Sequence, residues 1–156
     1  MNTLECIKTL EGHKFATTVC RLQNGQIATG SQDGKLYLWT KDGEKITEVQ
    51  AHSDIIRQII EVKDVGILTC SNDAVIKFFG FDTLEEYSSF PSIHDKFIFA
   101  IASLGDLDFA SGGEDNRIKT HIDGKEKDEI LLPSTVWQIL VDHSMNKDLL
   151  VACGDG

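Results

Sequence analysis

Histidine and aspartate are the residues of this chain whose types and spacing could do chemistry. The 156-residue sequence has five histidines and 25 acidic residues, and imidazole beside carboxylate can bind a metal ion or transfer protons. Three pairs recur with separations of 20, 21 and 21 residues: His13 with Asp33, His52 with Asp73, and His94 with Asp115. Ligands some 40 residues apart in separate units do not converge on one ion. The pattern therefore predicts structural pairs, with no metal site, no cofactor and no catalytic residue.

The positions around each pair repeat as well. Aspartates 33, 73, 115 and 155 are separated by 40, 42 and 40 residues. A hydroxyl residue stands four positions before each of the first three aspartates: Thr29, Thr69 and Ser111. Six positions after them stand Trp39, Phe79 and His121. A period near 40 with these marks resembles the WD repeat, in which each unit is a four-stranded blade of a β-propeller.

The resemblance implies one hydrogen-bonded string within each blade. His13 is expected in the loop before the innermost strand, Asp33 in the turn between the second and third strands, and Thr29 and Trp39 on those strands. Buried polar groups need such partners. The second string should stop at its hydroxyl, because Phe79 has no donor, whereas His121 could still donate in the third. The fourth copy has Val151 at the hydroxyl position and should depend on packing.

The predicted fold is all-β, a partial WD40 β-propeller with three complete blades, a half blade and one orphan outer strand. Residues 1–156 form one propeller segment, with repeats at about 11–50, 51–90, 91–132 and, incomplete, 133–156. The expected strands are 18–22, 26–30, 35–40, 45–50, 56–62, 66–70, 75–81, 86–90, 98–103, 108–111, 118–121, 129–132, 137–141 and 149–152, preceded by the orphan strand 6–10. Open blade edges at both ends favour self-association.

Composition excludes several classes of function. Hydrophobic residues make up 41% of the chain, as in a globular protein. The net charge of -10 disfavours nucleic acid as a partner. We expect no membrane segment and no targeting signal, because no apolar run approaches about 20 residues and the start lacks a signal-peptide pattern. Four cysteines without C-x-x-C spacing are expected to be free thiols in a reducing compartment.

Three stretches in the second half carry a closer resemblance. They are Leu68-Thr-Cys-Ser-Asn-Asp73, Asp108-Phe-Ala-Ser-Gly-Gly-Glu-Asp115-Asn-Arg-Ile118 and Leu132-Pro-Ser-Thr-Val-Trp137. They resemble the last blades of the propeller in the phospholipase A2-activating protein family. Members of that family are ubiquitin-binding adaptors of the valosin-containing AAA ATPase, which they dock through a domain absent from this sequence. The resemblance implies ubiquitin as a partner, a role in proteasomal ubiquitin-dependent protein turnover, and a location in cytoplasm and nucleus.

The family pattern also indicates which positions face a partner. They flank the first core position of each innermost strand, taken as Val19, Ile56, Ile98 and Val136, or precede the turn aspartate. In the first copy they are Thr18 and Cys20. The predicted partner-binding residues are Arg57, Phe97, Phe99, Trp137, Asn72 and Glu114. Aromatic residues beside arginine are typical interface anchors. The alternative is that these aromatics are core, because strands between packed blades are apolar on both faces.

Two other functions stay open. One is a generic WD scaffold for another complex, such as a G-protein-β-like or RNA-processing assembly. The other is a propeller hydrolase or metal enzyme, which the sequence disfavours because the serines and cysteines lack a nucleophile elbow or a paired base.

Overall fold

The computed structural model describes residues 5–6, 8–142 and 148–154, and these contain strands and turns but no helix. The described residues therefore include no helix that could cross a membrane. The first sheet contains β1 (Ala16–Arg21), β2 (Ile27–Ser31), β3 (Lys35–Trp39) and β4 (Lys45–Gln50). The second contains β5 (Ile56–Val62), β6 (Gly66–Ser71), β7 (Val75–Phe79) and β8 (Glu86–Pro91). The third contains β9 (Ile98–Gly105), β10 (Asp108–Gly113), β11 (Arg117–Ile122) and β12 (Lys125–Leu131), and the last contains β13 (Val136–Asp142) and β14 (Asp148–Cys153).

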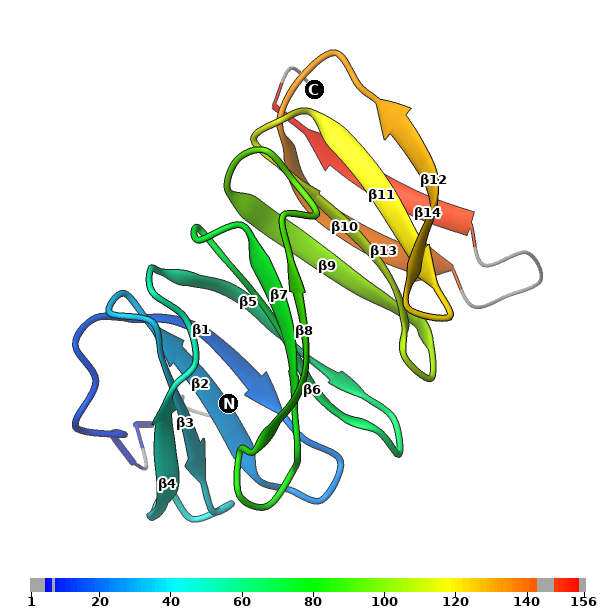
Figure 1. Cartoon of the computed structure of the whole chain (residues 1–156). Coiled ribbons are helices and arrows are strands. Elements are labelled where there is room, and N and C mark those ends of the chain that lie inside the picture. Colours follow the sequence, from blue (N-terminus) through cyan, green and yellow to red (C-terminus); the bar gives the residue numbers. More distant parts are fainter. Residues whose placement is uncertain (1–4, 7, 143–147, 155–156) are drawn as a thin grey trace.

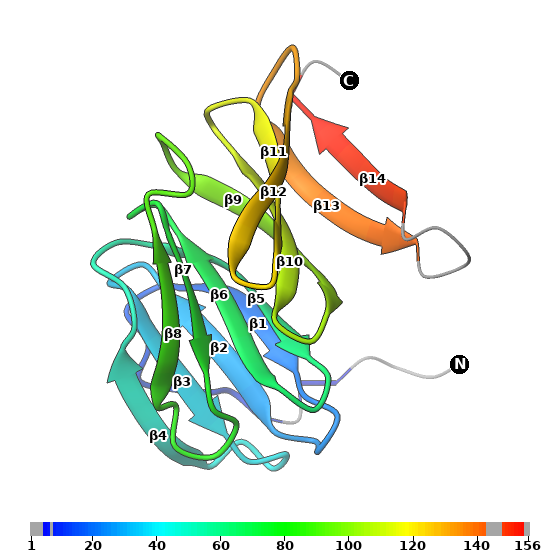
Figure 2. The same ribbon diagram turned by 45° about the vertical axis from the view of Figure 1, so that its right-hand side comes forward.

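Each sheet is a blade in which antiparallel strands follow one another in chain order. The blades fan out along an open arc, from the first blade in blue to the half blade in red (Figure 1). The first strands of successive blades, β1, β5, β9 and β13, are neighbours along the inside of the arc (Figure 2). This arrangement confirms the predicted partial WD40 propeller.

Glycines with left-handed backbone lie in the tight turns between strands. Gly25, Gly43 and Gly124 have φ of 88°, 81° and 72°. Gly34 (φ 78°) closes the turn between β2 and β3, and a Cβ there would lie 2.1 Å from the carbonyl oxygen of His52. Only glycine fits this position, because it combines a positive φ with close backbone approach.

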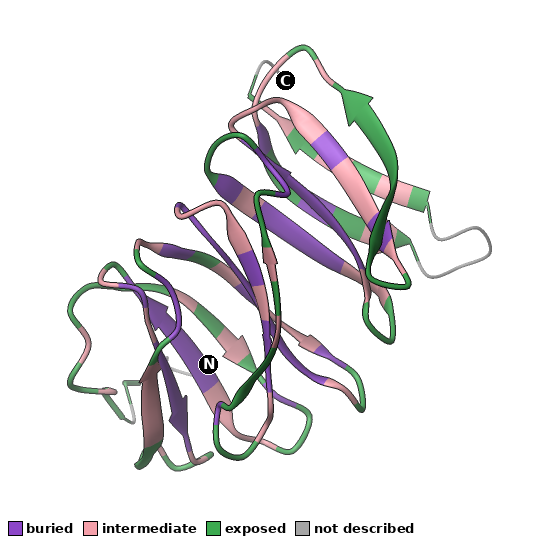
Figure 3. Cartoon of the chain, in the orientation of Figure 1, coloured by how far each residue is buried: buried purple, intermediate pink, exposed green. Residues whose placement is uncertain are grey.

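The hydrophobic core lies between blades rather than within one. Leu36 and Leu38 of the first blade pack against Ile59 and Ile67 of the second, and similar clusters join the later blades. Central strands such as β6 are buried over their whole length, whereas β12 is exposed throughout (Figure 3). The neighbouring blades cover both faces of a central strand, so residues that point in either direction are buried.

The structure corrects two sequence-based boundaries. Segment 6–10 was predicted as an outer strand, but its described residues form no strand and lie over the β3–β4 turn, where Lys8 pairs with Glu44 at 2.8 Å. An outer strand needs the third strand of its own blade as a partner, and no such strand is described before it. Strand β12 begins at Lys125, four residues earlier than predicted, because the Asp123-Gly124 turn directly precedes it.

Candidate functional site

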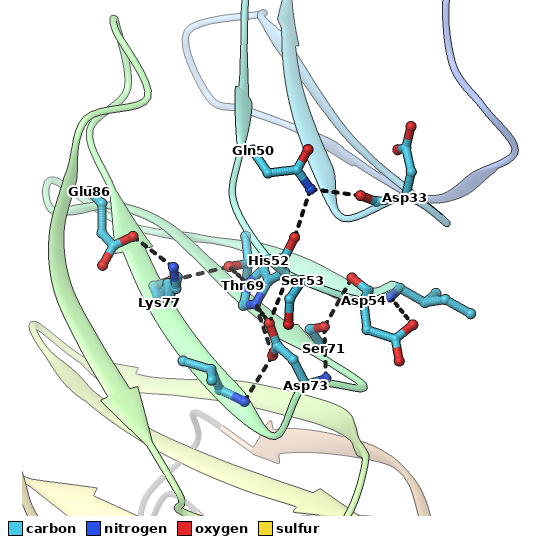
Figure 4. A network of polar contacts seen from close by, with 12 residues as sticks. Asp33, Gln50, His52, Ser53, Asp54, Thr69, Ser71, Asp73, Lys77 and Glu86 are labelled. Carbon is cyan, nitrogen blue, oxygen red and sulfur yellow. Dashed lines mark hydrogen bonds and ion pairs between the residues drawn. The ribbon is translucent and has the colours of Figure 1, made fainter.

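The histidine string is complete up to the hydroxyl in the second blade (Figure 4). His52 Nδ1 lies 3.1 and 3.0 Å from the two carboxylate oxygens of Asp73, and its Nε2 lies 2.8 Å from Thr69 Oγ1. Asp73 also accepts hydrogen bonds from the amides of Ser53 and Val75. With Phe79 in the tryptophan position, the string ends at Thr69. Every polar group of the string therefore has a protein partner.

Electrostatics keeps this carboxylate charged. Burial alone would raise the pKa of the Asp73 carboxyl. The hydrogen bond and charge of His52, together with the two backbone amides, lower this pKa by more than burial raises it. The resulting pKa lies below the ordinary value for aspartate. An ionised carboxylate that accepts from three N–H groups, those of the His52 ring, Ser53 and Val75, holds the loop before β5 against the β6–β7 turn.

The third blade repeats the string and leaves one buried atom without a partner. His94 Nδ1 lies 2.8 Å from Asp115 Oδ2, and its Nε2 lies 2.9 Å from Ser111 Oγ. His121, which could have donated to Ser111, instead stacks face to face on Phe109 with centroids 4.8 Å apart. Its Nδ1 is buried without a hydrogen bond. Position 121 therefore contributes packing to this blade and does not extend the string.

The first blade departs from the prediction at its carboxylate. Trp39 Nε1 donates to Thr29 Oγ1 at 2.8 Å, and His13 Nε2 lies 2.5 Å from the same oxygen. Asp33 does not reach His13 and accepts from Ser31 Oγ instead, at 2.5 Å, which lowers the pKa of its carboxyl. The loop before β5 is held by Gly34 O, which accepts from the amides of Ala51 and His52. No preceding blade in the described part of the chain does this for the loop of His13.

These strings join loops and turns within their blades. No group of three or more His, Cys, Asp and Glu among them could hold a metal ion. The four cysteines are free. Burial raises the pKa of the Cys20 and Cys70 thiols, which disfavours the nucleophilic thiolate.

The predicted binding residues lie together at the start of the innermost strands. The Phe99 ring stacks on the Trp137 indole, with centroids 4.8 Å apart and planes 3° apart. The Arg57 guanidinium lies 5.0 Å from the centre of the Phe99 ring, and its Nε donates to Asn72 Oδ1 at 2.7 Å. A continuous stack thus runs across three blades, from Arg57 through Phe99 to Trp137. We call these three residues with Asn72 the aromatic face.

The solvent exposure of the predicted aromatic and arginine residues distinguishes them from core residues. Trp137 is 55% exposed and Phe97 is 39% exposed, Arg57 is exposed, and Phe99 is half-buried within the stack. Phe97 lies 6.3 Å from Phe99, and Phe97 O accepts a hydrogen bond from the amide of Glu114. All six predicted residues are therefore on one side of the arc. Asn72 is nearly buried, and its role there is to hold Arg57.

One residue of this side was missed because the first copy was aligned three positions out of register. Val19, taken as core, is 67% exposed. It corresponds to Ile59 in the strand pairing, on the face that a preceding blade would cover. The residue equivalent to Ile55 and Phe97 is Phe15, whose carbonyl accepts from Gln32. The common spacing of 17 residues to the turn position was the available signal: Phe15 to Gln32, Ile55 to Asn72, and Phe97 to Glu114.

Comparison with known proteins agrees with this geometry. The model of the WD domain, G-beta repeat, matches residues 4–40. The ubiquitin homeostasis protein lub1 of Schizosaccharomyces pombe is 34% identical over 119 residues, which are 74% of this chain and 16% of that protein. The chain thus spans only a small part of the length of this relative.

Two solved structures share the fold. The crystal structure of the WD40 β-propeller domain of Doa1 is 27% identical, with a TM-score of 0.81 over 94% of this chain and 50% of that chain. The computationally designed Ika4 protein is 20% identical, with a TM-score of 0.82 over 99% of this chain and 95% of that chain. The chain is therefore a WD40-repeat protein that resembles the family of the ubiquitin-homeostasis and phospholipase A2-activating proteins.

Proposed function

We propose that this chain is a non-enzymatic protein-interaction module that binds ubiquitin or ubiquitylated proteins through the aromatic face. The observation that carries the proposal is the exposed stack of Arg57, Phe99 and Trp137. Exposing two aromatic rings to water is unfavourable unless a partner covers them, and Trp and Arg are the residue types most often found at binding hot spots.

The stack is also preorganised. Asn72 fixes the Arg57 side chain, and Phe99 is held between the guanidinium and the indole. Binding therefore has little side-chain entropy to remove, which favours affinity. Ubiquitin presents a mixed apolar and basic surface, and the net charge of -10 of this chain, with Glu114 beside the stack, complements it. The name of lub1 associates that relative with ubiquitin homeostasis.

The wider role follows from the resemblance. We propose that the module works in an adaptor of the AAA ATPase in proteasomal ubiquitin-dependent protein turnover, in cytoplasm and nucleus. The second candidate is a generic WD scaffold, which the same exposed face would also serve.

Titration of ¹⁵N-labelled ubiquitin with the chain, followed by NMR, tests the proposal. We expect localised shift changes, with Trp137→Ala and Phe99→Ala each weakening binding about tenfold or more. Ile130→Ala is the matched control, because Ile130 is also 55% exposed but lies on the outer strand β12. Its affinity should match the parent.

Thermal unfolding of the same variants separates binding from folding. Trp137→Ala should unfold within a few degrees of the parent, because the indole is largely exposed. Equal losses of affinity and stability would mean that the aromatics are core. Ubiquitin resonances that stay unmoved would reject the ubiquitin assignment and leave the generic scaffold.

A further inference from the structure

The guanidinium of Arg57 is held in place but is paired with no carboxylate. Among the described residues, the lysines and arginines that form ion pairs with glutamates are Lys8, Lys35, Lys45, Lys77, Arg117 and Lys119. Arg57 takes part in none of these pairs, although the chain has 25 acidic residues. Its Nε instead donates to Asn72 Oδ1 at 2.7 Å, and its head group lies over the Phe99 ring. Arg57 is thus a fixed positive charge that the described residues do not neutralise.

This charge lies on a complete blade with a blade on each side. Arg57 is the second residue of β5, which packs between β1 of the first blade and β9 of the third. The equivalent residue of the first blade is Thr17, whose hydroxyl donates to Ile56 O at 2.6 Å, inside the junction. Arg57 is exposed at the same position. The charge at position 57 is therefore not part of the contact that joins one blade to the next.

The contacts of Arg57 leave one edge of its guanidinium free to bind. The N–H donors of a guanidinium lie in its plane. The Phe99 ring lies against the group and Asn72 accepts the Nε–H, while neither Nη atom donates to a described residue. Paired N–H groups in one plane match the two oxygens of a carboxylate, which gives a bidentate, charge-assisted contact. Because the head group is already fixed, such a contact costs little side-chain entropy.

We propose that Arg57 binds a carboxylate of ubiquitin through its Nη groups, and that Asn72 is the residue that positions it. This inference rests on the proposed binding of ubiquitin and names one contact of that complex. The apolar part of the partner covers the rings of Phe99 and Trp137, while its carboxylate lies in the plane of the guanidinium. The carboxylate comes from a side chain of ubiquitin or from its C-terminus, and the experiment below distinguishes the two.

Charge makes this contact a determinant of orientation. The net charge of -10 repels a carboxylate and attracts basic groups to the rest of the face, where Glu114 lies beside Phe97. A carboxylate of the partner is therefore favourable opposite Arg57 and unfavourable elsewhere on this side. A partner rotated on the aromatic face would bring its carboxylate against acidic groups, so the contact with Arg57 selects one orientation.

Asn72→Asp separates this contact from simple stacking. The substitution keeps the shape of the side chain and the acceptor for Nε, but it adds a carboxylate that neutralises Arg57 within the chain. The third blade has Glu114 at the same turn position, so a carboxylate fits there. We expect at least about fivefold weaker binding of ubiquitin. General attraction of a basic partner would give the opposite change, because the variant is more acidic than the parent.

NMR titration of ubiquitin with Arg57→Gln tests the charge itself. We expect a dissociation constant at least about tenfold above that of the parent. Arg117→Gln is the matched control, because Arg117 is already paired with Glu129 on the neighbouring strand. The affinity of this control should match that of the parent. Thermal unfolding checks that all three variants keep the stability of the parent to within a few degrees.

A double-mutant cycle identifies the carboxylate. Each surface aspartate or glutamate of ubiquitin is replaced in turn by asparagine or glutamine, and one further form has an amidated C-terminus. One of these changes should weaken binding to the parent about tenfold and change binding to Arg57→Gln by less than about twofold. The change that shows this coupling assigns the carboxylate to a side chain or to the C-terminus.

The outcomes distinguish the contact from the proposed function. If ubiquitin binds but no change in its carboxylates is coupled to Arg57, or if Asn72→Asp binds as tightly as the parent, the contact is wrong and the ubiquitin assignment stands. Equal losses for Arg57→Gln and Arg117→Gln would indicate a general charge effect and would also overturn the contact. Ubiquitin resonances that do not move with the parent would reject the proposed function and this contact with it.

Discussion

At the scale of single residues, the equivalent aspartates of neighbouring blades have different hydrogen-bond partners. Asp73 holds His52 and two amides, whereas Asp33 is bonded to Ser31 and leaves His13 aside. Asp73→Ala should lower the free energy of unfolding by about 3–5 kcal/mol, because it leaves a buried imidazole and amides without an acceptor. Asp33→Ala should cost only about 1 kcal/mol. Urea denaturation of the pair measures the difference, and equal costs would contradict the assigned strings.

Two buried histidines, His121 and His94, should make the third blade sensitive to acid. Burial lowers the pKa of His121 and of His94, in the latter case against the opposing effect of Asp115. Histidine in the unfolded chain titrates near pH 6.5, so the unfolded state binds more protons just below that pH. Stability should be full above about pH 7 and should fall as the pH drops through 6.5. The lowered pKa of Asp73 adds a further loss at more acidic pH.

His121→Phe isolates this effect. The variant reproduces the phenylalanine that the second blade has at this position and removes the unpartnered Nδ1. We expect it to be more stable by about 1 kcal/mol at pH 7 and to lose less stability between pH 7 and pH 5. Unfolding midpoints at several pH values check both statements. A variant as acid-sensitive as the parent would assign the effect to His94 alone.

At the scale of elements, the turn between the second and third strands links each blade to the next. Gly34 and Ala74 occupy the same position in consecutive blades, with φ of 78° and 61°. Gly34→Ala should destabilise by about 2 kcal/mol or more, because the new Cβ would meet His52 O. Ala74→Gly should stabilise by about 0.5–1 kcal/mol by relieving left-handed strain. Chemical denaturation measures the free energy of unfolding of both variants. A change of the same sign in the two variants would contradict the prediction.

At the scale of the whole molecule, burial predicts where the chain opens first. Strand β6 is buried along its length, while β12 is exposed and β14 alternates between exposed and half-buried residues at a free edge. Hydrogen exchange should therefore be slowest in β6 and fastest in β12 and β14. Uniform exchange across all three strands would contradict this gradient.

The features that could be predicted from the sequence are those that depend on residues close together in the chain or on the repeat period. Strand alternation, Asp-Gly turns and the period near 40 depend on neighbours in the chain, so the blades and most strand boundaries follow from them. The partners of His52 and His94 follow too, because the spacing to Asp73 and Asp115 is repeated. The stacking of Phe99 on Trp137 concerns residues of adjacent repeats, and the period could place them only on the same side.

Other features required the tertiary structure, because they depend on what covers a residue. Asp33 has the same spacing from its histidine as Asp73, to within one residue, yet its string is incomplete because no described blade supports the loop of His13. Val19 reads as core and is exposed for the same reason. The sequence by itself determined the repeating blade and the partners of His52 and His94. Only the packing of one blade on the next decided which repeated residues are buried, because that burial is shared between units and absent at an open end.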